Sequence, residues 1–533
     1  MPTSAQPYDQ HASVSLRAER LIRSVARAGN RAIAGVPIVL RVEDRALRAR
    51  LAASLERMGA RVCADEVGLG EGAKGSATRA LVISDQPEPQ RPGVDSQRGA
   101  GAGARIDWAA EHMRATSRIA GELASSGALR GERVLLSLVL EPKTAALALA
   151  VARAGAEVAV FGAVNETDPG VASELAARGC AVFAPMGHVA PAEADARDRE
   201  HAAAALEWAP TLLVDDGAHL IRLAHTEHQT ALSARGGQLR AASEETTSGV
   251  RPLEEMAAAG ELLLPVIAAN DARTKLEFDN LIGTGQSCVF AVGDLLDSPR
   301  ATAAGIAAGV EGTRWAVIGY GPVGVGVARF AAALGARITV VEHDAVRALA
   351  AMHDGHEALP LAEALSGADI VVSATGVWHT LDAAALRSLR PGAVVAVAGG
   401  IDDEIGLDEL RAAGWHAVGV GDHIDEWRLP GGGMREQAGT GFFVLAGGGG
   451  VNYTAAEGNP IEAMDLSFAT QLVALDRLVG QEFAPGLHRL RVADEDRVAR
   501  AALAAFGGSA DPRAESGRPG GAAQDWRVHR YRA

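Results

Sequence analysis

Short apolar runs alternate with Ala-rich or amphipathic helical segments along most of this chain. Between residues 105 and 285 the apolar runs predict strands at 133–140, 157–161, 180–184 and 209–215. The segments between them have helical periodicity, most clearly at 143–154 and 168–178. Strands that alternate with helices of this length predict a parallel, doubly wound sheet.

The same alternation continues through residues 286–459, with strands predicted at 315–318, 337–341, 370–373 and 393–397. A long helix at 461–480 is expected to return to the first domain, so that residues 460–500 complete the 105–285 domain. The predicted fold is therefore α/β, with two doubly wound, Rossmann-like domains and a hinge cleft between them.

Two terminal regions flank these domains. Residues 1–104 form a small α/β extension with strands expected at 37–42, 61–64 and 80–84, a helix at 44–58, and a Pro- and Gly-rich linker at 86–103. We interpret the extension as a docking or oligomerisation element. Residues 501–533 contain a second flexible linker, at 507–524, and end in a basic and aromatic tail.

Composition narrows the class of protein. The 533 residues are 48% hydrophobic but only 4% aromatic, so Ala, Val and Leu must build the cores. A net charge of −15 argues against a nucleic-acid partner, since phosphate binding needs a basic face. Cys63, Cys180 and Cys288 are far apart, as in a reduced protein without a disulfide framework. No apolar stretch is long enough to span a membrane and no secretion signal is present, so we expect a cytoplasmic protein.

Residues 315–347 contain the most specific motif. An apolar strand leads into a glycine-rich turn, a helix follows, and a second strand ends in an acid. Gly319 makes the tight turn, Gly321 lets the backbone approach a pyrophosphate, and Gly324 lets helix and strand pack closely. Glu342 stands where a carboxylate binds both hydroxyls of an adenosine ribose, which selects NAD. Arg347 slightly weakens that preference, because an arginine there could meet a 2′-phosphate.

Four polar clusters precede the glycine turn, around Asp216, Glu245, Lys275 and Asp279. Acids, a lysine and an asparagine on loops between apolar runs suit acid–base chemistry on a hydroxyl-rich substrate. The alternative for each cluster taken alone is solvated loop charge. The histidines show no ligand spacing with cysteines or acids, so no metal site is predicted.

Taken together and in order, these motifs resemble the adenosylhomocysteinase family (S-adenosylhomocysteine hydrolases). The resemblance covers roughly residue 105 to the C-terminus. Its main motifs are Leu-Val-Asp-Asp216-Gly, Glu-Glu245-Thr-Thr-Ser-Gly-Val, Asn-Asp-x-x-Thr-Lys275-x-x-Phe-Asp279-Asn280-Leu, Gly-Tyr-Gly-x-Val-Gly-x-Gly, Thr375-Gly376 and Val451-Asn452.

The resemblance implies a tightly held NAD that serves as a recycled oxidant of the ribose 3′-hydroxyl. The ketone acidifies the 4′ C–H, a base removes that proton, the 5′-thioether leaves, water adds and the hydride returns. The implied catalytic residues are Asp216, Glu245, Lys275, Asp279 and Asn280. A lysine base requires a lowered pKa, which burial beside other charged groups can supply for Lys275. The implied cofactor residues, besides those of the glycine turn, are Thr246, Thr247, Ser248, Asn280, Val323, Thr375, Gly376 and Asn452.

The C-terminal tail also matches the family. Arg527 and Tyr531 stand where the family places a lysine and a tyrosine that close the cofactor site of the neighbouring subunit. Because arginine keeps the charge of lysine, the resemblance implies a homo-oligomer, either a dimer or a tetramer.

The departures from the family concentrate at one end of the substrate. The family's Leu-His-Met-Thr-x-Glu-Thr appears here as Leu138-Val-Leu-Glu141-Pro-Lys143-Thr144, and histidines are also lost at Gly400 and Asn459. The implied substrate residues are Glu141, Lys143, Thr144, Thr246, Glu457 and Asn459. Replacing an adenine-reading glutamate by Lys143 turns an acceptor into a donor, which suits a purine carbonyl, a carboxylate or a phosphate. Alternatively, Glu141 and Lys143 pair with each other and adenosine is tolerated.

Three functions therefore stay open. The first is hydrolysis of an adenosylhomocysteine-like thioether, which releases homocysteine and adenosine or analogues. The second is NAD-dependent 3′-oxidation of a different nucleoside or sugar, followed by elimination or epimerisation. The third is a catalytically silent NAD-binding regulatory protein, against which the joint presence of Asp216, Glu245, Lys275 and Asp279 argues.

Overall fold

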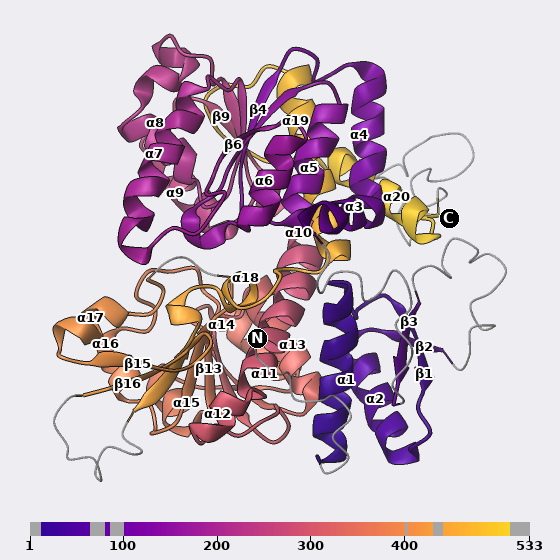
Figure 1. The fold of residues 1–533 in the computed structure, drawn as a ribbon, viewed down its shortest axis with the longest axis vertical. Coiled ribbons are helices and arrows are strands. Elements are labelled where there is room, and N and C mark those ends of the chain that lie inside the picture. Colours follow the sequence, from indigo (N-terminus) through magenta and orange to yellow (C-terminus); the bar gives the residue numbers. More distant parts are fainter. Residues whose placement is uncertain (1–11, 64–79, 86–100, 400–402, 430–440, 512–533) are drawn as a thin grey trace, which may run out of the picture.

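The βα alternation of the sequence folds into three sheets. The structure is a computed structural model that describes residues 12–63, 80–85, 101–399, 403–429 and 441–511. Within these ranges the strands form sheets of three, seven and eight strands. Figure 1 shows the two large sheets in two stacked units, with the small sheet beside the lower unit. The predicted α/β class with Rossmann-like sheets is confirmed.

The seven-stranded sheet of the upper unit is parallel throughout. In spatial order its strands are β18 (Gly486–His488), β9 (Pro265–Ala268), β8 (Ala241–Glu244), β7 (Leu212–Asp215), β4 (Arg133–Ser137), β5 (Glu157–Phe161) and β6 (Ala181–Phe183). Strand β4 ends three residues earlier than predicted. Glu141 caps the next helix and Pro142 is its first residue, so the chain must leave the sheet before them.

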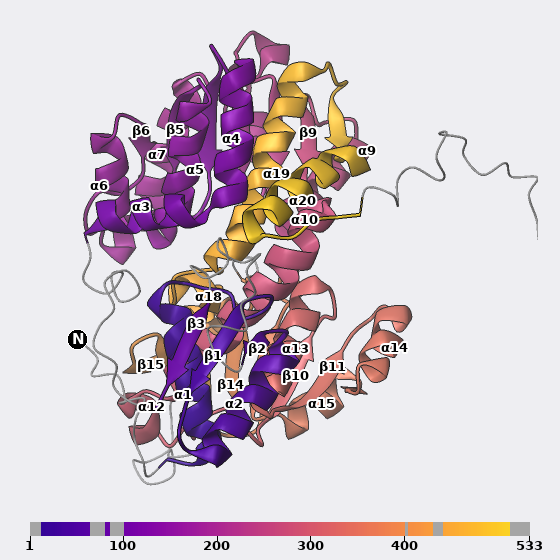
Figure 2. The same cartoon turned by 90° about the vertical axis from the view of Figure 1, so that its right-hand side faces the viewer.

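Helices cover both faces of this sheet. They are α3 (Ala102–His112), α4 (Arg114–Ser126), α5 (Pro142–Arg153), α6 (Pro169–Ala177), α7 (Ala194–Glu207), α8 (His219–Thr226), α9 (Thr247–Ala258), α19 (Ile461–Gly480) and α20 (Val492–Phe506). The last two come from the C-terminal part of the chain, and α19 packs against α4 (Figure 2). Their buried residues belong to the same core cluster as β4 and β5.

The eight-stranded sheet of the lower unit is mixed. In spatial order its strands are β12 (Glu357–Ala358), β11 (Arg337–Val341), β10 (Arg314–Ile318), β13 (Ile370–Ser373), β14 (Val394–Val397), β17 (Phe442–Leu445), β16 (Ile424–Arg428) and β15 (His416–Gly421). The first six are parallel, in the 3-2-1-4-5-6 order of a dinucleotide-binding fold. β15 and β16 pair antiparallel, which the expected parallel sheet did not include. Only two residues join them, too few for a parallel crossover.

Helices also flank this second sheet. They are α11 (Gly285–Leu296), α12 (Pro299–Ala303), α13 (Pro322–Leu334), α14 (Ala345–His353), α15 (Leu361–Gly367), α16 (Ala383–Arg387), α17 (Leu407–Ala412) and α18 (Val451–Thr454). Among the described helices of both units, none is long and apolar enough to cross a membrane.

The N-terminal extension is a small parallel α/β unit. Its elements are α1 (Val14–Ala28), β1 (Pro37–Arg41), α2 (Arg45–Met58), β2 (Arg61–Cys63) and β3 (Leu81–Ser84), with strand order β2-β1-β3. Buried Ile22 of α1 and Leu55 of α2 belong to the same core cluster as Val289 of α11 and Phe330 of α13. The extension therefore shares its core with the eight-stranded unit.

Two crossings join the large units. The first is α10 (Arg273–Lys275), then the π-helix η7 (Leu276–Thr284), then α11; the second runs from α18 into α19 (Figure 1). In each sheet the strand order reverses at one point, between β10 and β13 and between β4 and β7. Ligands of open parallel sheets bind outside the carboxyl ends of the strands at such points.

Candidate active site

The points at which the strand order reverses in the two large sheets both border one large cavity. Its volume is about 1690 Å³, above the roughly 300–1,000 Å³ of ordinary ligand sites. Ser137 and Asp216 line it from the seven-stranded unit, and Gly319 and Thr375 line it from the eight-stranded unit. The cavity is large enough for a dinucleotide together with a second small molecule.

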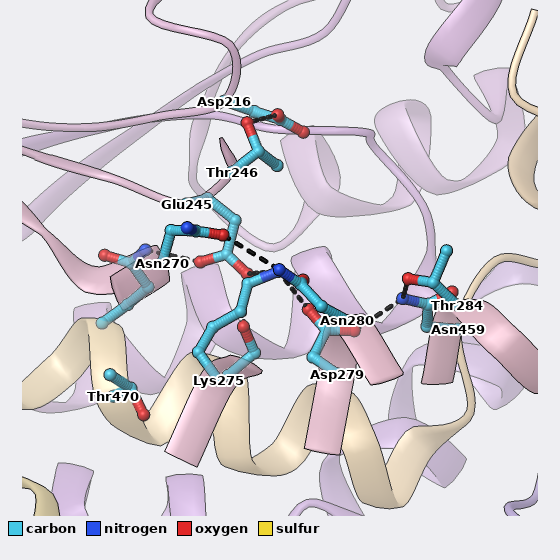
Figure 3. A network of polar contacts seen from close by, with 12 residues as sticks. Asp216, Glu245, Thr246, Asn270, Lys275, Asp279, Asn280, Thr284, Asn459 and Thr470 are labelled. Atoms are coloured by element: carbon cyan, nitrogen blue, oxygen red, sulfur yellow. Dashed lines mark hydrogen bonds and ion pairs between the residues drawn. The ribbon is translucent and has the colours of Figure 1, made fainter. Parts of the chain in front are cut away.

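Lys275 is the centre of a buried polar cluster in this cavity. Its Nζ lies 2.6 Å from Asp279 Oδ2, donates to Asn280 Oδ1 at 2.7 Å, and lies 3.7 Å from Glu245 Oε1. The side chains point toward one another in Figure 3. Lys275, Asp279 and Asn280 come from α10 and the start of η7. A π-helical turn in a helix often marks a functional site, and here it brings these three groups together.

The charge state of Lys275 corrects an expectation. Burial acts to lower the pKa of the ammonium, but the carboxylates of Asp279 and Glu245 outweigh burial, and the net pKa is raised where a lowered one was expected. Lys275 is therefore an ammonium in the resting site. It can accept a proton only after it has passed one of its own protons to a carboxylate partner, Glu245 or Asp279.

Glu245 is also held by two side chains of α19. Ser467 Oγ donates to its Oε1, and Gln471 Nε2 donates to its Oε2; both partners lie on α19. Burial raises the pKa of Glu245 to about 7, while the Lys275 ammonium acts to lower it and Asp279 to raise it. Glu245 therefore changes charge near neutral pH. Ser467 and Gln471 could not be found by sequence reasoning, because they come from a helix more than 200 residues away along the chain.

Three carboxylates gather at the end of β7 and β8. Thr246 Oγ1 lies 2.8 Å from Asp216 Oδ1 and 3.0 Å from Glu244 Oε1. Burial raises the pKa of Asp215 to about 6, and burial together with Asp215 and Asp216 raises the pKa of Glu244 well above its usual range. Sequence reasoning selected Asp216 and missed Asp215 and Glu244. All three belong to one acidic group beside the cavity, in which Asp215 and Glu244 have raised pKa values.

The wall formed by Glu141 and Lys143 differs from the family pattern in a defined way. Lys143 Nζ lies 2.8 Å from Glu141 Oε2 and 3.0 Å from the carbonyl oxygen of Glu457. Thr144 Oγ1 donates to the carbonyl oxygen of Val139 at 2.7 Å. Glu141 and Lys143 therefore pair with each other, which was the alternative considered for these positions.

Asn459 stands where the family pattern has a histidine, and it has a clear structural role. Its Nδ2 donates to Asp279 Oδ1 at 2.6 Å and to Thr284 Oγ1 at 2.9 Å, and its Oδ1 accepts from Ser287 Oγ at 2.7 Å (Figure 3). The Asn459 amide therefore holds Oδ1 of Asp279, while Oδ2 faces Lys275.

The glycine turn has the geometry expected of a phosphate-binding turn. Gly319 has φ +92°, which favours glycine, and a Cβ on Gly324 would lie 2.0 Å from the Gly319 carbonyl oxygen. A Cβ on Gly321 would meet only Arg347, at 3.7 Å, so this backbone is open to the cavity. Glu342 accepts from the Tyr320 N–H at 2.7 Å and from the Asp344 N–H at 2.9 Å.

Further predicted cofactor residues line the same cavity. They are Thr246, Thr247, Ser248, Asn280, Val323, Thr375, Gly376 and Asn452. Thr375 is held by the buried carboxylate of Glu404. The Thr375 N–H and the Thr375 Oγ1 both donate to this carboxylate at 2.8 Å. Asn452 Oδ1 is buried and has no hydrogen-bond partner among the described residues. A buried oxygen without a donor fits the carboxamide of a nicotinamide.

Three predicted features are not placed. Arg527 and Tyr531, and the loop at Gly400, lie outside the described residues.

Comparisons with known proteins agree with this geometry. Residues 293–458 match the family model described as "S-adenosyl-L-homocysteine hydrolase, NAD binding domain". Adenosylhomocysteinase of Thermotoga maritima is 35% identical over 420 residues, which cover 78% of this chain and 97% of the relative. S-inosyl-L-homocysteine hydrolase of Methanopyrus kandleri is 36% identical over 406 residues, which cover 75% of this chain and 90% of the relative.

Proposed function

The chain belongs to the adenosylhomocysteinase family, and from this premise we propose that it is an NAD-dependent hydrolase of a nucleoside 5′-thioether. The products are homocysteine and a free nucleoside. One observation carries the proposal: the Lys275 cluster and the glycine turn open into the same cavity. The proposed reaction needs an oxidant for the ribose hydroxyl, and it needs groups that move the protons of the ribose. Both must lie in the same cavity.

The residues around the cavity fit a bound NAD. Gly319, Gly321 and Val323 would carry the pyrophosphate at the start of α13, where helix N–H groups and the helix dipole favour negative charge. Glu342 would bind the adenosine ribose, and Asn452 Oδ1 would accept a hydrogen bond from the nicotinamide amide. When bound there, NAD supplies reversible removal of a hydride from the 3′ carbon.

The Lys275 cluster would bind and deprotonate the ribose. Glu245 accepts hydrogen bonds from the ribose hydroxyls. Lys275 orients the 3′ oxygen, and it takes up the hydroxyl proton after passing one of its own protons to Glu245, whose pKa is raised to about 7. Asp279 is held by Asn459 at one oxygen and by Lys275 at the other, which fixes a base for the acidified 4′ proton. At the 5′ end, Asp216 lies beside Asp215 and Glu244, two buried carboxyl groups whose raised pKa values let them supply protons to the leaving sulfur.

A second candidate concerns the base of the nucleoside. Lys143 is a buried donor, and a purine with a 6-oxygen offers it an acceptor. The relative from M. kandleri is named S-inosyl-L-homocysteine hydrolase, which is consistent with that base. Glu141 bears on the choice between the two purines. With Lys143 it presents an acceptor and a donor side by side, and this pair can also match adenine. We propose that both thioethers are substrates and that the 6-oxo base is preferred.

The proposed reaction is tested by mixing the purified protein with S-adenosyl- and S-inosyl-L-homocysteine while recording reduced-nicotinamide absorbance and released thiol. Wild type should show both signals. Lys275→Ala should lose both, while Thr274→Val, a neighbouring buried change that breaks only the contact to Thr470, should keep them. Cofactor reduction without thiol would favour 3′-oxidation of a different substrate, and neither signal from any nucleoside would favour a silent NAD-binding protein.

Domain limits, assembly and location complete the proposal. The substrate domain is 105–285 with 460–500, the cofactor domain is 286–459, and 1–104 is an extension. Residues 501–533 form the tail, and its Arg527 and Tyr531 support a homo-oligomer in which they close the neighbouring cofactor site. Cys63, Cys180 and Cys288 are all free thiols, which supports a reducing compartment such as the cytoplasm. Light scattering of full-length protein against a chain ending at residue 511 tests the assembly.

A further inference from the structure

The N-terminal extension is anchored to the eight-stranded unit by ion pairs on α1. Arg20 Nη2 lies 2.6 Å from Asp297 Oδ1, and buried Arg23 pairs with both Asp294 and Asp297 at the end of α11. Breaking one partner of a buried pair is strongly destabilising, so α1 has a fixed position beside α11. The extension is therefore a rigid support and not a loosely tethered domain.

The segment that follows α1 reaches the second crossing between the large units. Asn30 Nδ2 donates to the carbonyl oxygens of Glu457 at 3.1 Å and Asn459 at 3.3 Å. The Ile461 N–H donates to the Asn30 carbonyl oxygen at 2.9 Å. Asn30 has φ +47°, a left-handed conformation that asparagine tolerates better than most residues. This turn of the extension thus holds the loop 457–461 at three points.

Neighbouring contacts fix Asn30 itself. Arg31 pairs with Glu462 at the start of α19, and the Ala32 N–H donates to the same carboxylate at 2.8 Å. On the other side, Gln286 of α11 accepts from the Ile33 N–H at 2.7 Å and donates to the Arg31 carbonyl oxygen at 2.9 Å. The extension is therefore bonded to both crossings, α11 and the start of α19, next to the active site.

The loop held by Asn30 carries two contacts on which the active site depends. The Asn459 side chain fixes Asp279, and the Glu457 carbonyl oxygen accepts from Lys143 at 3.0 Å as well as from Asn30. A second cavity, of about 320 Å³, lies at this end and is lined by Asn30 together with Glu141, Lys143 and Glu457. A shift of the loop would therefore move two groups together: Asp279, the proposed acceptor of the 4′ proton, and Lys143, the proposed contact to the purine.

We propose that the extension holds the active site in place through Asn30, a positioning residue that fixes the loop bearing Glu457 and Asn459. Asn30 reaches the reacting groups only through that loop. The effect on turnover rests on the proposed function, whereas the effect on the loop does not. The test therefore needs one measurement of each kind.

Asn30→Gly removes the side-chain donor and keeps a residue that accepts positive φ, so the backbone of the turn is preserved. Asn30→Asp places a carboxylate against two carbonyl oxygens. Arg50→Ala is the matched control, because it loses a 2.7 Å bond from the extension to the Leu334 carbonyl oxygen, at the far end of α13. The full-length proteins are compared by amide hydrogen exchange of a peptide covering 457–462 and by steady-state hydrolysis of both thioethers.

Exchange of the 457–462 peptide should accelerate roughly tenfold or more in both Asn30 variants, as expected for the loss of two hydrogen bonds, and stay unchanged in Arg50→Ala. Turnover should fall by a similar factor, with KM for the thioether raised, while the amount of bound NAD stays constant. Wild-type exchange in Asn30→Gly, or equal effects in Arg50→Ala, would overturn the inference. A wild-type protein that hydrolyses neither thioether would instead refute the proposed function, and the exchange comparison would still decide the role of Asn30.

Discussion

Replacement of Glu245 by glutamine makes the electrostatics of the site measurable. The side chain is 4% exposed, its carboxylate faces Lys275, and burial raises its pKa from 4.5 to about 7. The folded protein thus keeps a proton that the unfolded chain releases above pH 4.5. This contribution to stability is complete below pH 4.5 and is lost as the pH rises through 7.

The size of the effect follows from the pKa difference. At about 1.36 kcal/mol per pKa unit, the step from 4.5 to about 7 corresponds to about 3 kcal/mol. Glu245→Gln removes this titration and keeps the shape of the side chain. Lys275 does not add to the change, because its raised pKa keeps it charged throughout the window. The unfolding free energy of the variant minus that of wild type should therefore rise by about 3 kcal/mol between pH 4.5 and 8.

Urea unfolding of both proteins at half-unit steps from pH 4 to pH 9 measures this difference. Subtracting the two curves cancels every other titrating group that the substitution leaves unchanged. The expected result is a difference that climbs between pH 4.5 and 7 and is flat on either side. A difference that does not vary with pH would refute the reasoning, because it would mean that Glu245 is ionised in the folded protein at its ordinary pKa.

Two other substitutions test the two ends of the cavity. Glu342→Gln removes the charge that we propose selects a free ribose 2′-hydroxyl, so NAD affinity should fall by roughly tenfold or more and discrimination against NADP should collapse beside Arg347. Titration of both dinucleotides into stripped protein measures this, and an unchanged NAD-to-NADP ratio would contradict the role of Glu342. Lys143→Glu should raise kcat/KM for S-adenosyl- relative to S-inosyl-L-homocysteine by roughly tenfold or more, since it replaces the donor by an acceptor. An unchanged ranking of the two thioethers would show that position 143 does not read the base.

The sequence predicted the parts of the fold and site that depend on local chemistry. The glycine turn from β10 into α13 was predictable because Gly319 needs a positive φ and Gly324 packs on the Gly319 carbonyl, and both requirements appear as glycines at fixed spacing. The parallel strands were predictable because buried parallel strands are continuous apolar runs. The confirmed family resemblance rests on these same motifs.

Other features could not be predicted because they arise from contacts between distant segments. The raised pKa of Lys275 depends on how Asp279 and Glu245 are placed around it, and burial alone gives the opposite direction. Ser467 and Gln471 reach Glu245 from α19, and Asn30 reaches the loop at Asn459 across more than 400 residues of sequence. The antiparallel β15–β16 hairpin was not predicted, because its sequence contains no turn motif strong enough to distinguish a hairpin from a connection between parallel strands.

We propose above all that the Lys275 and Asp279 cluster removes the 4′ proton of a ribose beside a bound dinucleotide. Incubating the purified protein with adenosine or inosine in deuterium oxide, without homocysteine, and locating the label by NMR tests it most directly. Wild type should place deuterium at C4′ of the recovered nucleoside, and Lys275→Ala should give background levels. Thioether hydrolysis by a wild-type protein that leaves C4′ free of deuterium would contradict it.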